Sequence, residues 1–523
     1  MTRRPTLPRL SLPLSRRHLL RTGLAAAVWT GAGGLRAQPF EVYPFGLGVA
    51  SGSPTPFGVI LWTRVTFPPP PPVNLYSFEK VALPSHPPVD LIWEVAEDAG
   101  FARILQSGQV RCTPAFGHSA HVAVTGLAPD RWYFYRFRAG LTVSPVGRTR
   151  TAPAADALPG ASMGPMRLAF ASCQQYEQGY YAALRDMSRR DLDLVVHLGD
   201  YIYEMSYGAD HVRSHGTGNP LTLDDYRARY ALYKSDPDLQ AAHAAAPWLA
   251  IWDDHEVANN YHNDDAPRVQ GGAPFLKMRA AAYQAWYEHM PVPPHVGGDF
   301  AHFRIYGSHA FGGLLDLALL DDRQYRSAAL PDHAGQDSPA RTMLGAQQEH
   351  WLDATLKGSK ARWTVIAQQT LVSERDLEEG PDERFSLDTW DGYRHARARL
   401  LTSVQEAGLA NPLVIGGDLH AFYAADVKRD FGAEGAPTLA TEFVTGAITS
   451  NPPSETAIAR ALAENPHLRF ATGRQHGYGV MTLGADSAQV DFIAISDRKD
   501  PQATARVAQS FAVLDGRPGV NRI

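Results

Sequence analysis

Short runs of apolar residues recur along the chain from residue 166 onward. The run over 194–198 is almost entirely apolar, which is typical of a strand buried on both faces of an α/β sheet. Helical patterns separate these runs, and Asp236-Pro237 interrupts the one over 223–246, since proline breaks a helix. We predict further strands over 167–171, 249–252, 365–367 and 413–417, and helices over 176–189, 223–246, 274–290, 344–356 and 392–407.

Other segments of this region have the pattern of added, partly antiparallel strands. The predicted strands cover 302–306, 312–319, 441–445, 477–483 and 489–495. Strand–helix units with added antiparallel strands indicate a four-layer α/β core, in which two mixed sheets are flanked by helices. We place this core at 166–499, and the tail 500–523 carries little periodic signal.

The region before residue 154 has a different pattern, with short strands separated by turn residues. The segment 127–137 has the corner-tyrosine arrangement of a fibronectin-type sandwich. We therefore predict an all-β, fibronectin/Ig-like sandwich domain over 38–153, followed by a linker rich in Ala, Pro and Gly over 154–165. The unbroken proline run over 68–72 is expected to form a stiff surface loop.

The N-terminus has the pattern of an export signal. Arg16 and Arg17 form a twin-arginine pair, and an apolar stretch and small residues near Ala37 follow it. We expect 1–37 to be a signal peptide for the twin-arginine export machinery and the mature protein to be periplasmic or secreted. The alternative, a membrane anchor, is less favoured because the apolar stretch is short and rich in Gly and Ala. No later stretch is apolar enough to span a membrane. We expect the protein to be a monomer.

Composition places the chain among ordinary globular proteins and gives no sign of a nucleic-acid binder. It has 523 residues, 44% hydrophobic and 20% charged, with 49 Lys and Arg against 54 Asp and Glu. The formal net charge of -5 offers no general attraction for polyanions, so we expect no nucleic-acid partner. Any phosphate recognition would have to be local.

The sequence contains two cysteines, Cys112 and Cys173. A disulfide is the ordinary expectation in an exported protein. However, Cys112 belongs to the predicted sandwich and Cys173 follows a strand of the α/β core. We therefore expect no disulfide and interpret Cys173 as a thiolate metal ligand.

Chemically active side chains follow the predicted core strands. Ligands of open α/β sheets bind beyond the carboxyl ends of the strands, where these side chains would meet. A single Gly-Asp after a strand is usually a turn or a helix cap, but several acid- and histidine-containing motifs in one chain favour a shared metal centre. Side-chain alternation would place Asp418 and His420 on one side of their strand. The motifs are Ser172-Cys173, Gly199-Asp200 with Tyr203, Asp253-Asp-His-Glu256, Gln368-Gln369 and Asp418-Leu-His420.

These motifs also carry a family resemblance. They occur as Ala171-Ser-Cys173, Gly199-Asp-Tyr-Ile-Tyr203, Trp252-Asp-Asp-His-Glu256 and Gly417-Asp-Leu-His420, together with Gly48-Val-Ala-Ser-Gly-Ser53, Leu320-Asp-Asp-Arg-Gln-Tyr-Arg326 and Asp388-Thr-Trp-Asp-Gly-Tyr393. The set resembles the PhoD-like alkaline phosphatase/phosphodiesterase family of metallophosphoesterases, which is similar to the purple acid phosphatases. The match covers about 45–496.

The resemblance implies a metal ligand set. One metal would be bound by Cys173, Tyr203, His420 and a bridging Asp200, a set that suits Fe³⁺. Tyr203 stands where purple acid phosphatases have a phenolate bound to ferric iron.

The other metal would be bound by Asp200, Asp254, Gln369 and Asp418, all through oxygen. Oxygen ligation without imidazole favours Ca²⁺ over zinc, and the family carries iron with calcium. Asn259 and Asn260 are further candidate oxygen donors.

The reaction that the resemblance implies is hydrolysis of a phosphate ester. A metal-bound hydroxide or oxide at the Fe–Ca centre would attack in line, with Asp200 as a catalytic ligand and His255 as proton donor or phosphate partner. Arg213 and Asn260 are candidates for substrate binding, and an ordinary surface role is an equal alternative for Arg213. A phospholipase D-like phosphodiesterase acting on lipid head groups and a non-catalytic cell-surface binding protein are the alternative functions.

Overall fold

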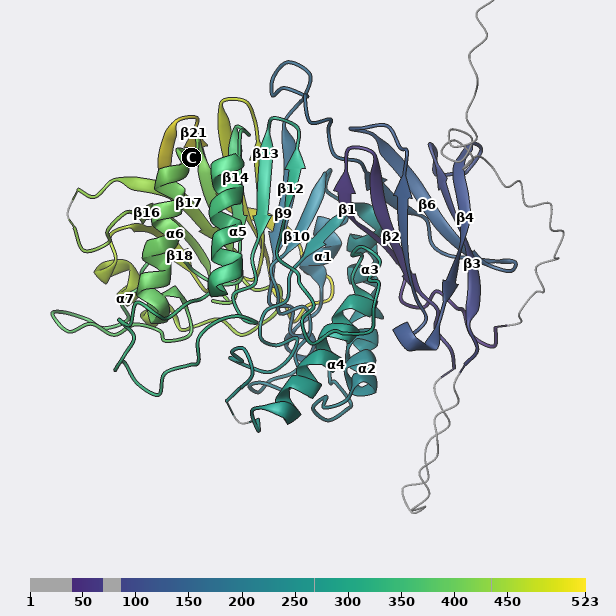
Figure 1. Ribbon diagram of the computed structural model, residues 1–523, viewed down its shortest axis with the longest axis horizontal. Coiled ribbons are helices and arrows are strands. Elements are labelled where there is room, and N and C mark those ends of the chain that lie inside the picture. Colours follow the sequence, from purple (N-terminus) through teal and green to yellow (C-terminus); the bar gives the residue numbers. More distant parts are fainter. Residues whose placement is uncertain (1–39, 69–85, 268, 434) are drawn as a thin grey trace, which may run out of the picture. The chain divides into compact units, whose positions relative to one another are not determined.

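The computed structural model describes residues 40–68, 86–267, 269–433 and 435–523 (Figure 1). The predicted signal peptide over 1–37 and most of the proline run over 68–72 lie outside the described residues. Among the described helices, none combines the length and the apolar character needed to cross a membrane.

A ten-stranded sheet forms the first half of the core, in the order β22-β21-β20-β19-β9-β10-β11-β1-β2-β5. At its centre β9, β10 and β11 run parallel, so their carboxyl ends reach the same edge. Antiparallel strands extend the sheet on the side of β9. The bounds are β9 Met166–Ala171, β10 Leu194–His197, β11 Trp248–Ala250, β19 Gly477–Leu483, β20 Ser487–Ile495, β21 Ala505–Leu514 and β22 Arg517–Arg522. Those of the other three are β1 Val49–Thr55, β2 Gly58–Arg64 and β5 Ser119–Thr125.

A seven-stranded mixed sheet forms the second half, in the order β12-β13-β14-β15-β17-β16-β18. Strands β13, β14, β15 and β17 run parallel. The bounds are β12 Gly307–Phe311, β13 Leu315–Leu319, β14 Trp363–Ala367, β15 Pro412–Gly416, β16 Phe422–Lys428, β17 Thr438–Val444 and β18 Leu468–Thr472. One apolar cluster joins the two sheets, since it contains Leu194 and Val196 of β10 together with Leu317 of β13 and Val365 of β14.

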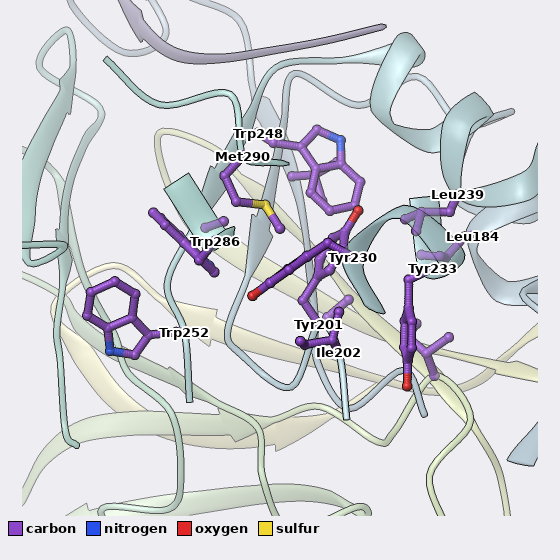
Figure 2. Packing of buried hydrophobic residues seen from close by; sticks show 14 of the residues in the cluster. Leu184, Tyr201, Ile202, Tyr230, Tyr233, Leu239, Trp248, Trp252, Trp286 and Met290 are labelled. Carbon is purple, nitrogen blue, oxygen red and sulfur yellow. The ribbon is translucent and has the colours of Figure 1, made fainter. Parts of the chain in front are cut away.

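Helices cover the outer face of each sheet, which confirms the predicted four-layer α/β arrangement. Val195 points away from the inner cluster and packs with helices α1 to α4, so β10 is buried on both faces as expected. Figure 2 shows this outer cluster, with Trp248 of β11 and Trp286 of α4 around Tyr230 of α2. The bounds are α1 Ala182–Met187, α2 Leu223–Lys234, α3 Pro237–Ala245, α4 Ala273–His289, α5 Gly345–Gly358, α6 Arg394–Ala407 and α7 Glu455–Glu464. In Figure 1, α5 and α6 lie over the seven-stranded sheet, and they share an apolar cluster with β14 and β15. Pro237 begins α3 directly after the break expected at Asp236-Pro237.

The N-terminal region folds as the predicted β-sandwich. A five-stranded sheet, β4-β3-β6-β7 with β8 on β6, packs against β1, β2 and β5 around a shared core. The corner tyrosine is Tyr133, whose hydroxyl accepts a hydrogen bond from the Ala128 amide at 2.9 Å. The bounds are β3 Val89–Ala96, β4 Ile104–Cys112, β6 Trp132–Ala139, β7 Thr142–Val143 and β8 Gly147–Arg150.

One sheet of this sandwich is continuous with the core. Strand β1 pairs in parallel with β11, with Gly52 opposite Trp248. The strands β1, β2 and β5 therefore belong both to the sandwich and to the ten-stranded sheet, and the division at 154–165 stays a prediction.

Three predicted segments differ in the structure. The predicted helix over 176–189 is a 3₁₀ turn over Tyr176–Gln178 followed by the short helix α1. The segment 302–306 is irregular, and the strand begins only at Gly307. The region 500–523 is not a structureless tail, because β21 and β22 extend the ten-stranded sheet. In β21 only Phe511 and Val513 are fully buried, so this strand lacks a strong apolar alternation.

Candidate metal centre

The carboxyl ends of β9, β10, β11 and β15 bring acidic, thiol and imidazole side chains together. These side chains form overlapping groups in which one ligand atom of each member lies within 4.8 Å of those of the others. Asp200 belongs to every group, at the end of β10. The groups are Cys173 with Asp200 and His420, Asp200 with Asp254 and His255, and Asp200 with Asp253, Asp254 and Asp418.

Left-handed backbone turns aim these side chains at one point. The φ angles are 60° at Cys173, 56° at Asp200, 60° at Asp418 and 55° at His420. Residues other than glycine rarely adopt this region, at a cost on the order of 1 kcal/mol or more each, and such strain collects at functional sites. Asp418 and His420 therefore approach the site through a sharp turn after β15, and not through the strand alternation that the sequence had suggested.

Tyr203 completes the group around Cys173 and His420. Its hydroxyl donates to Asp200 Oδ2 at 2.8 Å and lies 3.2 Å from His420 Nε2. Burial, followed by the charge of Asp200, raises the pKa of the Cys173 thiol and of the Tyr203 phenol well above their ordinary values. Both side chains therefore keep their protons unless a strongly attracting cation replaces them.

Several buried carboxylate oxygens of the second group lack a hydrogen-bond donor. Among the described residues these include Asp200 Oδ1, Asp253 Oδ2 and Asp254 Oδ1. A buried acceptor without a partner is costly, and adjacent orphaned oxygens fit a hard cation such as Ca²⁺. These carboxylates therefore fit the oxygen-only position of the metal pair that the resemblance implies.

Arg323 supplies a permanent positive charge to the same carboxylates. Its side chain is 1% exposed and pairs with Asp253, with Asp388 at 2.9 Å and with Asp418 at 3.4 Å. Its nearest approach to Asp254 is 3.9 Å. The sequence interpretation gave Arg323 no role, although its motif was identified. A guanidinium beside four carboxylates offsets part of their mutual repulsion.

His255 lies beside Tyr203 and is held by Glu204. Its Nδ1 donates to Glu204 Oε2 at 2.7 Å, and its ring stacks on that of Tyr203 at 4.1 Å. Burial lowers the pKa of His255, but the charges of Glu204, Asp254 and Asp200 outweigh it and raise the pKa well above its ordinary value. The sequence interpretation missed Glu204, although it directly follows Tyr203.

The Gln369 side chain forms hydrogen bonds with the backbone of neighbouring strand ends. Its amide nitrogen donates to the carbonyls of Trp252 at 2.8 Å and Leu320 at 3.1 Å, and its amide oxygen accepts from the Asp322 N–H at 3.2 Å. Gln369 therefore joins strand ends through their backbone, and its role as a metal ligand stays a prediction.

Arg213 is also absent from this group. Its guanidinium pairs with Asp236 at 2.6 Å, donates to the Gly179 carbonyl at 2.6 Å and lies 3.7 Å from the centre of the Tyr176 ring. These contacts anchor the loop after Glu204 to the start of α3, and the contact between Arg213 and substrate stays a prediction.

Asn260 lies at the rim of the site. Its N–H donates to Asp254 Oδ2 at 2.6 Å, its φ is 57°, and its side chain is half-buried. The preceding Asn259 donates its backbone N–H to Glu204 Oε1 at 3.0 Å. The turn over 259–260 therefore fixes both a carboxylate of the metal group and the partner of His255.

The structure agrees with the expectation of no disulfide, since Cys112 and Cys173 are both free and buried, and the ligand role of Cys173 stays a prediction. Burial raises the pKa of the Cys112 thiol to about 12. Cys112 ends strand β4 of the sandwich, whereas Cys173 lies two residues after the end of β9, in the metal group.

Comparisons with known proteins agree with the geometry. Residues 168–492 match the family model described as PhoD-like phosphatase, and residues 30–153 match the model of its N-terminal domain. Alkaline phosphatase D of Bacillus subtilis (strain 168) is 39% identical over 527 residues, which cover 96% of this chain and 87% of that protein.

Solved structures show the same relationship. The structure of PhoD matches with a TM-score of 0.85 and 38% identity, over 93% of each chain. A purple acid phosphatase from yellow lupin (Lupinus luteus) seeds matches with a TM-score of 0.56 over 90% of this chain and 74% of the other. At 12% identity, this second match shows a common fold only.

Proposed function

Because this chain belongs to the PhoD-like phosphatase family, we propose that it uses an Fe³⁺–Ca²⁺ centre to hydrolyse phosphomonoesters, phosphodiesters or both. By this membership the chain is a phosphoric ester hydrolase, and the alternative of a non-catalytic surface protein is set aside. The observation that carries the proposal is the presence of two chemically different ligand sets that share Asp200.

The proposed iron ligands are Cys173, Tyr203, His420 and Asp200. Thiolate, phenolate and imidazole donors together suit a transition metal, and two anionic donors favour its ferric state. The 2.8 Å contact between Tyr203 Oη and Asp200 Oδ2 supports this set, because the shared proton must leave when both oxygens bind a cation.

The proposed calcium ligands are Asp200, Asp254 and Asp418, with Asn260 as an additional oxygen donor or a substrate contact. All of these donors are oxygen, and the orphaned oxygens of Asp200 and Asp254 would gain a partner. Gln369 is not part of this proposal.

The side chains around the centre would have different roles in ester hydrolysis. When bound, the two cations supply Lewis-acid charge that polarises the phosphoryl group and lowers the pKa of water. Asp200 would set the spacing between the two positions, since it belongs to both sets. His255, held at Nδ1 by Glu204, would present Nε2 to a phosphoryl or leaving-group oxygen and transfer a proton there.

Metal analysis combined with an ester panel tests this proposal. We expect the purified protein to contain iron and calcium, EGTA to abolish hydrolysis, and added Ca²⁺ to restore it. The panel is p-nitrophenyl phosphate, bis(p-nitrophenyl) phosphate and phosphatidylcholine, which separates a monoesterase, a diesterase and an enzyme for lipid head groups. Full activity in calcium-free protein would overturn the calcium assignment.

We also propose export by the twin-arginine route, supported by Arg16 and Arg17 within the sequence pattern over 1–37. Replacing both arginines by lysine is expected to leave unprocessed protein in the cytoplasm, as measured by fractionation and mass determination. Normal secretion of this variant would show that another route is used.

A further inference from the structure

The segment Thr449–Asn451 lies directly against the thiol, phenol and imidazole group, although no sequence motif marked it. The backbone N–H groups of Thr449 and Ser450 both donate to the carbonyl of Cys173, each at 3.2 Å. Thr449 and Ser450 are 0% and 1% exposed, so water does not compete for these contacts. This segment therefore fixes the backbone of one proposed iron ligand.

Ser450 also contacts a second proposed ligand. Its hydroxyl oxygen lies 2.7 Å from Tyr203 Oη and 2.8 Å from the Cys173 carbonyl oxygen. A serine hydroxyl has one proton to donate, so the state of Tyr203 decides where that proton goes. When Tyr203 is a phenol, it donates its own proton to Asp200, and Ser450 is free to donate to the Cys173 carbonyl.

A Tyr203 phenolate changes this hydrogen bonding, because a phenolate can only accept. Asp200 is an acceptor as well, and His420 approaches Tyr203 with Nε2. Among the described side chains at hydrogen-bond distance from Tyr203 Oη, Ser450 is then the donor. The structure thus has a hydroxyl in place for the deprotonated form of Tyr203.

Asn451 fixes the third proposed ligand. Its carbonyl accepts from His420 Nδ1 at 2.8 Å, which leaves Nε2 on the side of Tyr203 and Asp200. Histidines that bind metals commonly donate their other ring N–H in this way. Asn451 is itself held, since its N–H donates to Gln178 Oε1 at 2.6 Å and its Oδ1 accepts from Arg498 at 2.7 Å.

We propose that Ser450 is a positioning residue that donates a hydrogen bond to the phenolate oxygen of Tyr203, while Asn451 directs His420 Nε2 to the same metal position. This inference rests on the proposed function, because it concerns the phenolate form that iron binding requires. A hydrogen bond donated to a phenolate oxygen lowers the energy of the electrons that this oxygen would share with iron. The Ser450 hydroxyl therefore sets the energy of phenolate-to-iron charge transfer and the strength of the iron–phenolate bond.

The experiment compares Ser450→Ala and Ser450→Thr in the iron- and calcium-loaded protein. Ser450→Ala is expected to shift the visible absorption band to longer wavelength and to lower kcat by about tenfold. Such a loss of activity is usual when a residue that holds a metal ligand is mutated. Ser450→Thr keeps the hydroxyl and is expected to retain the wild-type band. Iron content and the unfolding temperature are measured beside the spectrum, so that loss of metal or of fold is separated from a change in the phenolate.

Ser119→Ala is the matched control. Ser119 is also a buried serine, and its hydroxyl donates to the Phe116 carbonyl at 2.9 Å in the sandwich, away from the metal group. The Ser119→Ala variant should lose a similar hydrogen bond, with no change in the visible spectrum or in kcat. Ser450→Cys, which keeps the shape and offers a weaker donor, should give a smaller shift in the same direction as alanine.

The outcomes separate this inference from the proposed function. A coloured, iron-containing wild type whose spectrum and kcat are unchanged by Ser450→Ala would overturn the role of Ser450 and leave the iron centre standing. Should the alanine variant not fold, an unchanged band in Ser450→Cys would have the same consequence. A wild type that binds no iron and has no visible band would overturn the proposed iron centre and this inference with it.

Discussion

Glu204 Oε2 accepts a hydrogen bond from His255 Nδ1 at 2.7 Å, and both side chains are buried. The other oxygen of Glu204 accepts from the Tyr207 hydroxyl at 2.7 Å and from the Asn259 N–H at 3.0 Å. Glu204 is thus held at both oxygens and cannot turn away from the histidine. Since Nδ1 of His255 is bonded to Glu204, only Nε2 can contact a substrate or transfer a proton to it.

Replacing Glu204 by glutamine should therefore impair catalysis. The amide keeps the size of the side chain but loses the charge that orients and holds the imidazolium form. We expect kcat to fall by about 10²-fold, the lower range for a positioned proton donor, with KM nearly unchanged. Steady-state kinetics on p-nitrophenyl phosphate measures both constants.

Tyr207→Phe is the control for this variant. It removes one contact to Glu204 and leaves the bond to His255 in place, so a loss below about threefold is expected if each contact is worth about 0.5 kcal/mol. Wild-type kcat in Glu204→Gln would show that the bond to Glu204 does not govern the action of His255.

The two cysteines should respond differently to replacement by alanine. Cys173→Ala removes an anionic donor from the proposed iron position, so iron content, visible absorption and hydrolysis should fall together. Cys112→Ala removes a buried sulfur from the sandwich and should change only stability, by about 1 kcal/mol. Iron analysis, spectra and activity on the two variants decide, and equal effects would contradict the assignment of Cys173.

His197 should make the fold sensitive to acid. Burial lowers its pKa to about 3, and its Nδ1 accepts from the Gly199 N–H at 3.4 Å, as only the neutral ring can. His197 binds a proton with a pKa near 6.5 in the unfolded chain, but with a pKa of about 3 in the folded chain. The stability from the neutral form is therefore complete above pH 6.5 and is lost as the pH falls toward 3, at about 1.4 kcal/mol per pH unit for this residue.

The variant His197→Asn tests this linkage. Asparagine keeps an acceptor for the Gly199 N–H and does not titrate. The slope of unfolding free energy against pH between 6 and 4 should be smaller in the variant by about 1.4 kcal/mol per pH unit. Urea unfolding of chelator-treated protein measures the slope, and parallel curves for variant and wild type would exclude the effect.

The sequence predicted the core strands and the members of the metal group because both depend on local patterns. The run over 194–198 is apolar because β10 is buried on both faces, and a strand end is where an acidic residue is tolerated. The family resemblance then assigned roles to Cys173, Tyr203 and His420, which the structure does bring together.

The contacts that hold this group were not predictable in the same way. Ser450 lies 247 positions from the phenol that it contacts, and Arg323 lies 70 positions from Asp253. Neither residue carries a local pattern that points to its partner. The role of Gln369 depends on the fold in the same way, since a strand-end amide can bind a metal or the backbone equally well.

The sandwich boundary shows the same limitation. Its strands were recognised from turn spacing and the corner tyrosine, yet the pairing of β1 with β11 joins segments far apart in the sequence. Strand β21, which lies between β20 and the edge strand β22, was missed because few of its side chains are buried.

A side chain at Gly199 would disturb the centre directly. It follows β10 with a φ of 105°, and a Cβ placed on it would lie 2.4 Å from the Cβ of Asp253 and 2.6 Å from its backbone nitrogen. The neighbouring Asp200 belongs to every metal group, so relief of this clash must displace either Asp200 or Asp253. Glycine therefore allows the ends of β10 and β11 to approach as closely as the proposed metal centre requires.

Gly199→Ala should accordingly lower both stability and metal affinity. Overpacking at such a contact costs about 1–3 kcal/mol, and the positive φ adds to it. We expect a lower unfolding temperature, a higher Ca²⁺ requirement and at least a tenfold loss of activity at limiting Ca²⁺. Gly358→Ala, at the end of α5, is the control, since a Cβ there meets nothing within 4 Å. It should be neutral or slightly stabilising, by up to about 1 kcal/mol. A Gly199→Ala enzyme with the calcium response of the wild type would show that the spacing of Asp200 and Asp253 does not depend on this close approach.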